Sequence, residues 1–383
     1  MVATSEIEAN EFNLNIPRYI ESQETEDIQD IEAHLMGGIP QTDIAALSQF
    51  WEVFPTVKNA LFAKTKRAKY ASLKVQKEEI KSTILEHPEF VAFTSLMDTL
   101  FKKWKKKNTK ELQGLTIGFN PKELIHDLSE GLLDNYHKKP LIDPYDMYQH
   151  LMNYWNEVMQ DDCYLISQDG WKAETQRIIV ESGKNKKKVD KGWTCDLLPK
   201  GLVIQRYFKS EAAALEAEQT KKESIASSIN ELVEEHSGEE GYFGEMEKVS
   251  KANVSARLKE LKGNKEASEE IAVLKKYLEL LLEQSKTNTL IRIAETELDD
   301  FIYAKYPNLT KDEIKELVVE DKWMQSIEKA IQNEIDHISQ RLTNRIKKLA
   351  VRYEHSLPEI DQKLEDLENK VIGHLQKMGF LWN

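Results

Sequence analysis

The chain has 383 residues, of which 40% are apolar and 31% are charged, with 15 Gly and 10 Pro. This length allows roughly two or three domains with substantial cores, and the composition is typical of a helix-rich protein. The net charge of −13 argues against a protein that coats nucleic acid uniformly, although it allows a local basic surface. No apolar run approaches the ~20 residues that cross a bilayer, and the N-terminus is acidic rather than signal-like. We therefore expect a cytoplasmic protein.

The start of the chain is expected to be an irregular tail. Residues 1–40 contain prolines, an acidic stretch and the pair Gly37-Gly38, which are poor material for a packed element. A short helix through Ile28, Ile31 and Leu35 is the regular element that we expect there.

Residues 41–160 alternate helical patterns with breakers, and together with residues 161–209 they form the first expected domain. Each helix is expected to begin at a capping residue or at a proline in the first turn. The expected helix starts are Thr42 or Asp43, His87-Pro88, Asn120-Pro121 and Asp143-Pro144.

Residues 161–209 change to short β-type runs, so the sequence predicts a small β insert in a helical protein. Polar residues 182–191 suit a hairpin connection. The expected strand segments are Tyr164–Ile166, Arg177–Val180, Trp193–Leu197 and Leu202–Ile204. Asp161 and Asp162 resemble a paired carboxylate, but adjacent residues on a regular element point apart, and we interpret them as a turn or cap. Cys163 and Cys195 are too few for a disulfide framework and lack zinc-site spacing, which predicts two reduced thiols.

Residues 210–383 are expected to be helical almost throughout, with breaks near 234–242, 263–264 and 306–308. Apolar residues then follow a coiled-coil-like spacing of three and four. The first half of this seam is Ile331, Ile335, Ile338, Leu342, Ile346, Leu349 and Tyr353. The second half is Ile360, Leu364, Leu367, Val371, Leu375 and Met378. The two halves either pack against each other as an internal antiparallel hairpin, or the second half binds helices of another subunit. The fold class is therefore mainly α, multi-helical, with a small β-hairpin insert and C-terminal coiled-coil-like helices.

Two groups of lysines could contact a DNA backbone, which would position a duplex without reading its bases. The first surrounds Trp104 and comprises Lys102, Lys103, Lys105, Lys106, Lys107 and Lys110. The second lies in the expected hairpin connection and comprises Lys184, Lys186, Lys187 and Lys188. The alternatives are a solvated helix face with Trp104 in the core, and an ordinary soluble loop tip.

No catalytic, cofactor-binding or metal-binding residue is predicted. An S-adenosylmethionine-dependent adenine methyltransferase needs a Gly-rich turn after a buried strand and an Asn/Asp-Pro-Pro-aromatic loop. Asp143-Pro144-Tyr145 comes closest, but it lacks the second proline and is better explained as a helix start. The nine His form no metal-binding pair on one helix, and there is no phosphate-binding glycine loop.

The run Glu11–Tyr19, with the sequence EFNLNIPRY, closely resembles a segment of the modification (M) subunits of type I restriction-modification systems. In that family of N6-adenine DNA methyltransferases the segment ends the catalytic domain. Further segments resemble the C-terminal extension carried by one subgroup of these subunits. They are Asp30–Glu32, Gly37–Pro40, His87–Phe90, Pro140–Asp146, Met159–Tyr164, Asp169–Lys172 and Lys191–Asp196.

The resemblance implies that the chain is the part that follows the catalytic domain. Residues 1–40 would be the tail after the absent domain, 41–209 a helical domain and 210–383 an assembly region. The cofactor, S-adenosylmethionine, would belong to the full subunit, and we expect no activity from this chain alone. The expected partners are the specificity subunit, with the restriction subunit as a further candidate, and DNA. The alternative is a free-standing helical adaptor or nucleic-acid-binding protein unrelated to methylation.

Overall fold

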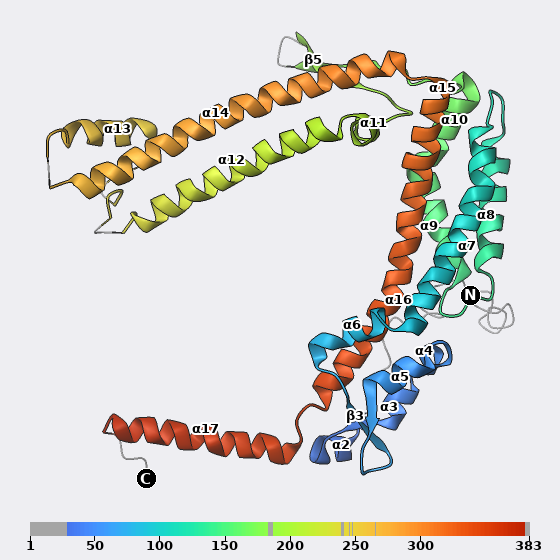
Figure 1. The fold of residues 1–383 in the computed structure, drawn as a ribbon, viewed down its shortest axis with the longest axis vertical. Helices are drawn as coiled ribbons and strands as arrows, with labels where there is room; N and C mark the ends of the chain where they lie inside the picture. Colours follow the sequence, from blue (N-terminus) through green and yellow to red (C-terminus); the bar gives the residue numbers. More distant parts are fainter. Residues whose placement is uncertain are drawn as a thin grey trace, which may run out of the picture. The chain divides into compact units, whose positions relative to one another are not determined.

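The computed structural model describes residues 29–182, 187–238, 241–244, 246, 248–264 and 266–379, and Figure 1 shows their fold. The protein is 74% helical with short antiparallel strands, so the prediction of a mainly α fold with a small hairpin is confirmed. The segment Glu11–Tyr19, which carries the clearest family resemblance, lies outside the described residues. Among the described helices, none combines the length and the apolar character that a membrane-spanning segment requires.

The chain divides into two compact units that are interleaved along the sequence. The described part of unit 1 comprises residues 29–99, 138–142 and 333–379, and unit 2 comprises residues 100–137 and 143–332 where described. The sequence predicted consecutive domains instead, at residues 41–209 and 210–383. Helices α7 (Pro88–Gln113) and α16 (Gln325–Arg352) each contribute residues to both units.

Unit 1 consists of short helices, a small sheet and the long helix α17 (Leu357–Lys377). Its three strands pair antiparallel in the order β1-β3-β2, a sheet that was not expected from the sequence. The other elements are α2 (Ile31–Met36), β1 (Ile39–Pro40), α3 (Gln41–Ala45), α4 (Ser48–Val53), α5 (Pro55–Leu61), β2 (Phe62–Lys64), β3 (Tyr70–Leu73), η2 (Lys77–Glu79) and α6 (Ile80–Leu85).

The helix cap predicted at Thr42 or Asp43 is wrong. Pro40 is the N-cap of α3, because its extended backbone belongs to strand β1, which pairs with β3. Asp43 instead accepts a hydrogen bond at 3.0 Å from the hydroxyl of Tyr353. The same hydroxyl accepts the backbone N–H of Asp30 at 3.4 Å. Tyr353 therefore ties the end of α16 to the elements at the start of unit 1.

Aromatic side chains form the core of unit 1. The Phe54 ring lies 5.5 Å from that of Phe90 and 5.4 Å from that of Phe93. The predicted start of α7 at His87-Pro88 is confirmed. Glu89 in its first turn accepts the backbone N–H groups of Thr56 at 2.9 Å and Val57 at 3.2 Å. A side chain of α7 thereby satisfies the free N–H groups at the start of α5.

Unit 2 contains the longer helices and the hairpin. The confirmed helix starts are Asn120, whose side chain accepts the N–H of Lys122, and Asp143, whose side chain accepts that of Tyr145. Besides parts of α7 and α16, its elements are α8 (Pro121–Tyr136), α9 (Pro144–Tyr154), the π-helix η3 (Trp155–Met159), α10 (Gln160–Asp169), β4 (Gln176–Ser182), β5 (Lys187–Thr194), α11 (Lys200–Tyr207), α12 (Lys209–Glu235), α13 (Lys251–Glu260), α14 (Ser268–Lys305), the 3-10 helix η4 (Tyr306–Asn308), α15 (Lys311–Glu316) and the π-helix η5 (Leu317–Met324).

Two of the expected strand segments are helical. Tyr164–Ile166 lies in α10 and Leu202–Ile204 lies in α11, because short apolar runs do not distinguish a strand from a buried helix segment. The expected strand Arg177–Val180 is confirmed within β4. Its partner β5 (Lys187–Thr194) begins ahead of the predicted return strand Trp193–Leu197 and shares only Trp193 and Thr194 with it.

Helices α12 and α14 lie side by side (Figure 1). An ion pair of 3.1 Å between Lys221 and Glu283 joins them. A separate small hydrophobic core lies where α13 and the segment after α12 pack against α12 and α14. Its buried members are Leu232, Phe243, Val254, Leu261, Leu274 and Tyr277.

Candidate interaction surface

Helix α17 begins at a capping box, the local sequence pattern that specifies a helix start. The backbone N–H of Ser356 donates to the Glu359 carboxylate at 3.2 Å, and Pro358 occupies the first turn, where its missing N–H is tolerated. From there the helix runs to Lys377 without a buried residue. Most of the stability of a helix in a protein comes from packing of its apolar face, so such a helix gains from a packing partner.

The second half of the predicted seam lies on α17 and is exposed. Leu364, Leu367 and Val371 have exposed fractions of 55%, 58% and 56%. Ile360 and Met378 are also exposed, and Leu375 is half-buried. These residues do not pack back against α16, so the internal hairpin alternative is wrong. The structure brings the six predicted residues to one helix face, with Met378 just after the last helical residue.

The first half of the seam has a different environment. All seven of its residues are buried, six of them along α16 and Tyr353 just after its end, and none exceeds 4% exposure. The two halves share the same spacing of apolar residues, yet one half is core and the other is surface.

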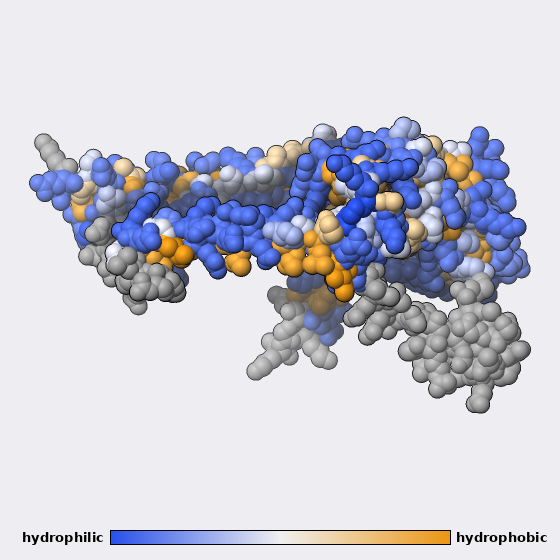
Figure 2. All heavy atoms as spheres, turned by 90° about the horizontal axis from the view of Figure 1, so that it is seen from below, coloured by the Kyte–Doolittle hydropathy of each residue, from blue (hydrophilic) through white to orange (hydrophobic). Residues whose placement is uncertain are grey.

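Helix α2 contacts α17 in unit 1 and also carries exposed apolar residues. Ile31, Leu35 and Met36 of α2 are exposed. In Figure 2, hydrophobic residues gather along one edge of the helix that lies in front. A shallow hollow of about 430 Å³ is lined by Leu367, Glu368, Val371, Ile372 and Leu375. Exposed apolar residues that gather on one helix face mark interaction sites on folded proteins.

The first lysine group lies on α7 in unit 2. Lys102, Lys103, Lys106, Lys107 and Lys110 are exposed. Lys105 instead pairs with the carboxylates of Glu328 at 3.0 Å and Glu320 at 3.5 Å. Trp104 is buried and donates its indole N–H to the Leu128 carbonyl oxygen at 3.3 Å. The tryptophan is therefore a core residue, and Lys105 already has its charge compensated.

The second lysine group is described only in part. Lys184 and Lys186 lie outside the described residues. Lys187 and Lys188 lie in strand β5 rather than in the expected connection. Lys188 stands opposite Glu181 of β4 in the antiparallel register, where opposite charges favour the pairing.

A buried polar centre in unit 2 was not expected from the sequence. Asp162 and Lys322 are 3% and 8% exposed. The Lys322 ammonium lies 2.7 Å from Asp162 Oδ2 and donates to the Leu197 carbonyl oxygen at 2.8 Å. The Trp323 indole N–H donates to Asp162 Oδ2 at 2.8 Å. The expectation of a turn or cap at Asp162 is wrong, since the residue lies inside α10.

The helical geometry explains why these groups meet. Met159, Asp162, Cys163 and Ile166 are all buried and follow the spacing of one helix face, a signal that could have placed Asp162 inside. The wider turn of η5 directs both Lys322 and Trp323 into the interior. Burial raises the pKa of Asp162, against the opposing effects of the Lys322 ammonium and the Trp323 indole N–H. Paired in this way, the centre holds α10, η5 and the segment after β5 together.

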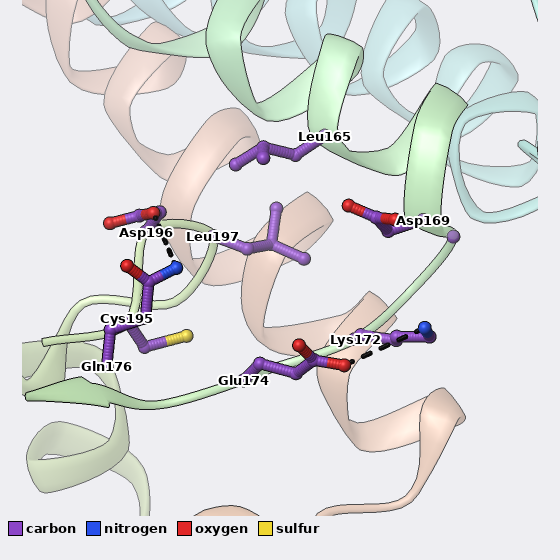
Figure 3. Close-up of a pocket in the computed structure, with 9 residues that line it drawn as sticks. Leu165, Asp169, Lys172, Glu174, Gln176, Cys195, Asp196 and Leu197 are labelled. Carbon is purple, nitrogen blue, oxygen red and sulfur yellow. Dashed lines mark hydrogen bonds and ion pairs between the residues drawn. The ribbon is translucent and has the colours of Figure 1, made fainter.

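A small hollow next to this centre contains Cys195 (Figure 3). Its volume of about 70 Å³ is enough for a few water molecules. Figure 3 shows the Cys195 sulfur and the Asp169 carboxylate pointing into it from opposite sides. Gln176 donates to Asp196 at 3.4 Å and Lys172 pairs with Glu174 at 3.7 Å along its edge. Both cysteines of the chain are free and buried, as expected, and the size of the hollow does not suit a nucleotide or cofactor.

Within the described residues, no group of three or more His, Cys, Asp or Glu side chains is arranged to hold a metal ion. Comparisons of the chain with protein-family models, with curated proteins and with solved structures find no match. The exposed apolar face of α17 is therefore the strongest candidate for a functional site.

Proposed function

We propose that this chain is the C-terminal part of a type I restriction-modification M subunit, acting in assembly with the specificity subunit. The resemblance of Pro140–Asp146, Asp169–Lys172 and Lys191–Asp196 to the extension of such subunits supports the family. Methyl transfer would then take place on a catalytic domain that carries the S-adenosylmethionine site. The chain itself would bind the specificity subunit and contact the DNA backbone.

The exposed seam of α17 is the observation that carries the proposal. Complete burial of a Leu or Val side chain is worth about 1.5–3 kcal/mol, and a half-exposed one retains roughly half of that for binding. Leu364, Leu367 and Val371 are more than half exposed and lie on one face. A helix of a partner that covers this face would bury all of them at once, as helix-in-groove recognition requires.

The clamp on DNA is proposed for the exposed lysines of α7. Lys102, Lys103, Lys106 and Lys107 lie in a helix of an otherwise acidic protein. Ammonium groups of this kind bind phosphates without regard to base sequence. Lys105 is not part of this clamp, because Glu320 and Glu328 hold it.

Co-purification with the matching specificity subunit tests the proposal. We expect a stable complex that is lost when Leu364, Leu367 and Val371 are all replaced by Asp. The matched control replaces Gln362, Asn369 and Gln376, which lie on the opposite face of α17, by Asp. This control adds the same charge and should leave binding intact, and circular dichroism checks that both variants keep their helices. Retained binding by the seam variant would refute the assignment of the face.

Two further tests address the proposed family. Titration of the chain with S-adenosylmethionine should release no heat, and a measurable affinity would contradict the proposal that the cofactor site lies elsewhere. The DNA upstream of the gene should encode a Gly-rich cofactor motif and an Asn-Pro-Pro-Phe loop, with a specificity subunit gene downstream. If neither flanks the gene, the alternative of a free-standing helical adaptor is favoured.

A further inference from the structure

The exposed face of α17 follows a heptad repeat from Leu357 to Val371, after which the next apolar residue of the seam is Leu375. Heptad positions a and d form the seam of a coiled coil, and positions e and g flank it. Taking Leu357 as the first a position, the a positions are Leu357, Leu364, Val371 and Met378. The d positions are Ile360, Leu367 and His374. One polar residue, His374, therefore interrupts an otherwise apolar seam.

The two edges of this seam carry opposite charges. The g positions are Lys363, Lys370 and Lys377, so one edge is basic along its whole length. The e positions are Asp361, Glu368 and Leu375, so the other edge is acidic over its first two heptads. Within the single chain, the ammonium of Lys363 lies 3.2 Å from Nε2 of His355.

The charges on the two edges of α17 complement those of a second copy when the two helices are parallel. When two copies of a helix pair in parallel, a g residue of one faces the e residue of the next heptad on the other. Lys363 would then face Glu368 of a second copy, twice by symmetry. An antiparallel pair would bring the two lysine edges together, and like charges at these positions repel.

We infer that the free chain associates with a second copy of itself through a parallel pairing of α17. This face is the one that the proposed function assigns to the specificity subunit. A second copy of the chain would therefore compete with that subunit for α17. Self-pairing would cover the apolar seam while the partner is absent, and the partner would displace it. Self-association is measured on the chain alone, so its outcome is independent of whether the specificity subunit binds.

Three heptads make a weak pair. Each copy contributes only the 21 residues of α17 to the pair, and a polar residue in the seam costs further stability. We therefore expect a dissociation constant roughly in the micromolar range or weaker. The replacement His374→Leu should tighten the pair, because it completes the apolar seam.

Sedimentation of the full chain over a range of concentrations tests the inference. We expect a monomer that converts to a dimer as concentration rises. Lys363→Glu and Glu368→Lys should each weaken the dimer about fivefold, because each places like charges opposite one another. The double variant K363E/E368K exchanges the two charges and should restore the wild-type constant. A dimer indifferent to both single changes, or a monomer at every concentration, would overturn the inference.

Orientation is tested by cross-linking. A cysteine at His374 lies near one end of the helix, so it meets its counterpart in a parallel pair and is far from it in an antiparallel one. We expect oxidised glutathione to convert H374C, but not the outer-face control Q362C, to a disulfide-linked dimer. Cys163 and Cys195 are buried and do not interfere. Absence of this product in a dimer would exclude the parallel arrangement. The proposed function is tested by binding of the specificity subunit, which is measured separately and does not depend on the cross-linking result.

Discussion

In the interior of unit 2, the ammonium of Lys322 lies 2.7 Å from Oδ2 of Asp162. The two residues are 160 positions apart in the sequence, so this ion pair joins α10 to η5. Lys322 also donates a hydrogen bond to the Leu197 carbonyl oxygen, and Asp162 also accepts one from the Trp323 indole N–H. Such a centre costs desolvation, and it contributes stability only while both charges are present.

The Asp162–Lys322 pair predicts a large effect of removing one partner. Asp162→Asn should lower the free energy of unfolding by about 3–5 kcal/mol, because it leaves the Lys322 ammonium buried without its counter-charge. Asp161→Asn, at the exposed neighbouring position, is the control and should change stability little. Urea denaturation measures both. Similar losses for the two variants would contradict the structural importance of the buried pair.

The capping box of α15 predicts a dependence of stability on acid pH. The backbone and side chain of Thr310 donate hydrogen bonds to Glu313 and, together with those from Tyr207 and Lys305, lower the pKa of Glu313 to about 2. Because this pKa lies below that of the unfolded chain, the stabilisation is complete above about pH 4.5. It is then lost as the pH falls toward 2.

Glu313→Gln tests this dependence. The variant should lose about 1 kcal/mol at neutral pH, as expected for a helix cap, and its difference from the wild type should vanish near pH 2. The exposed Glu295→Gln on α14 serves as the control. A difference for Glu313→Gln that stays constant with pH would show that the carboxylate charge is not what stabilises the cap.

The buried thiols predict slow chemical modification. Burial raises the pKa of both Cys163 and Cys195, so little thiolate forms at neutral pH and access is restricted. A thiol reagent such as dithiobis-nitrobenzoate should label neither residue quickly in the folded protein and both quickly in urea. Rapid labelling of two thiols in the native protein would contradict the burial of these side chains.

The exposed lysines of α7 predict salt-dependent DNA binding. Replacing Lys102, Lys103, Lys106 and Lys107 by Glu should weaken binding and reduce the slope of log affinity against log salt by about one for each phosphate that is no longer bound. The control replaces exposed lysines of α12 and α14 by Glu and matches the change in net charge. These control positions are Lys209, Lys222, Lys275 and Lys276. Equal weakening by both sets would indicate a general charge effect and would contradict a site on α7.

Several features could be predicted because their causes are local. A cap followed by proline predicted the helix starts at Asn120 and Asp143, and the structure confirms both. The cap predicted at Thr42 or Asp43 failed because pairing of β1 with the distant β3 fixes the backbone at Pro40. The strand expected at Tyr164–Ile166 failed for a related reason, since the run lies in α10, where Ile166 belongs to the face that unit 2 buries and Tyr164 is exposed.

For the candidate site, the sequence by itself determined the seam, its heptad spacing and the charges on its edges, because these depend on residue order along one helix. The tertiary structure alone decided which half is covered. Residues Ile331–Tyr353 and Ile360–Met378 have the same spacing, yet the first half is core along α16 and the second is exposed on and just after α17. Periodicity defines an apolar face, whereas burial depends on what other segments of the chain bring against it. The meeting of Asp162 with Lys322 was likewise decided only by packing.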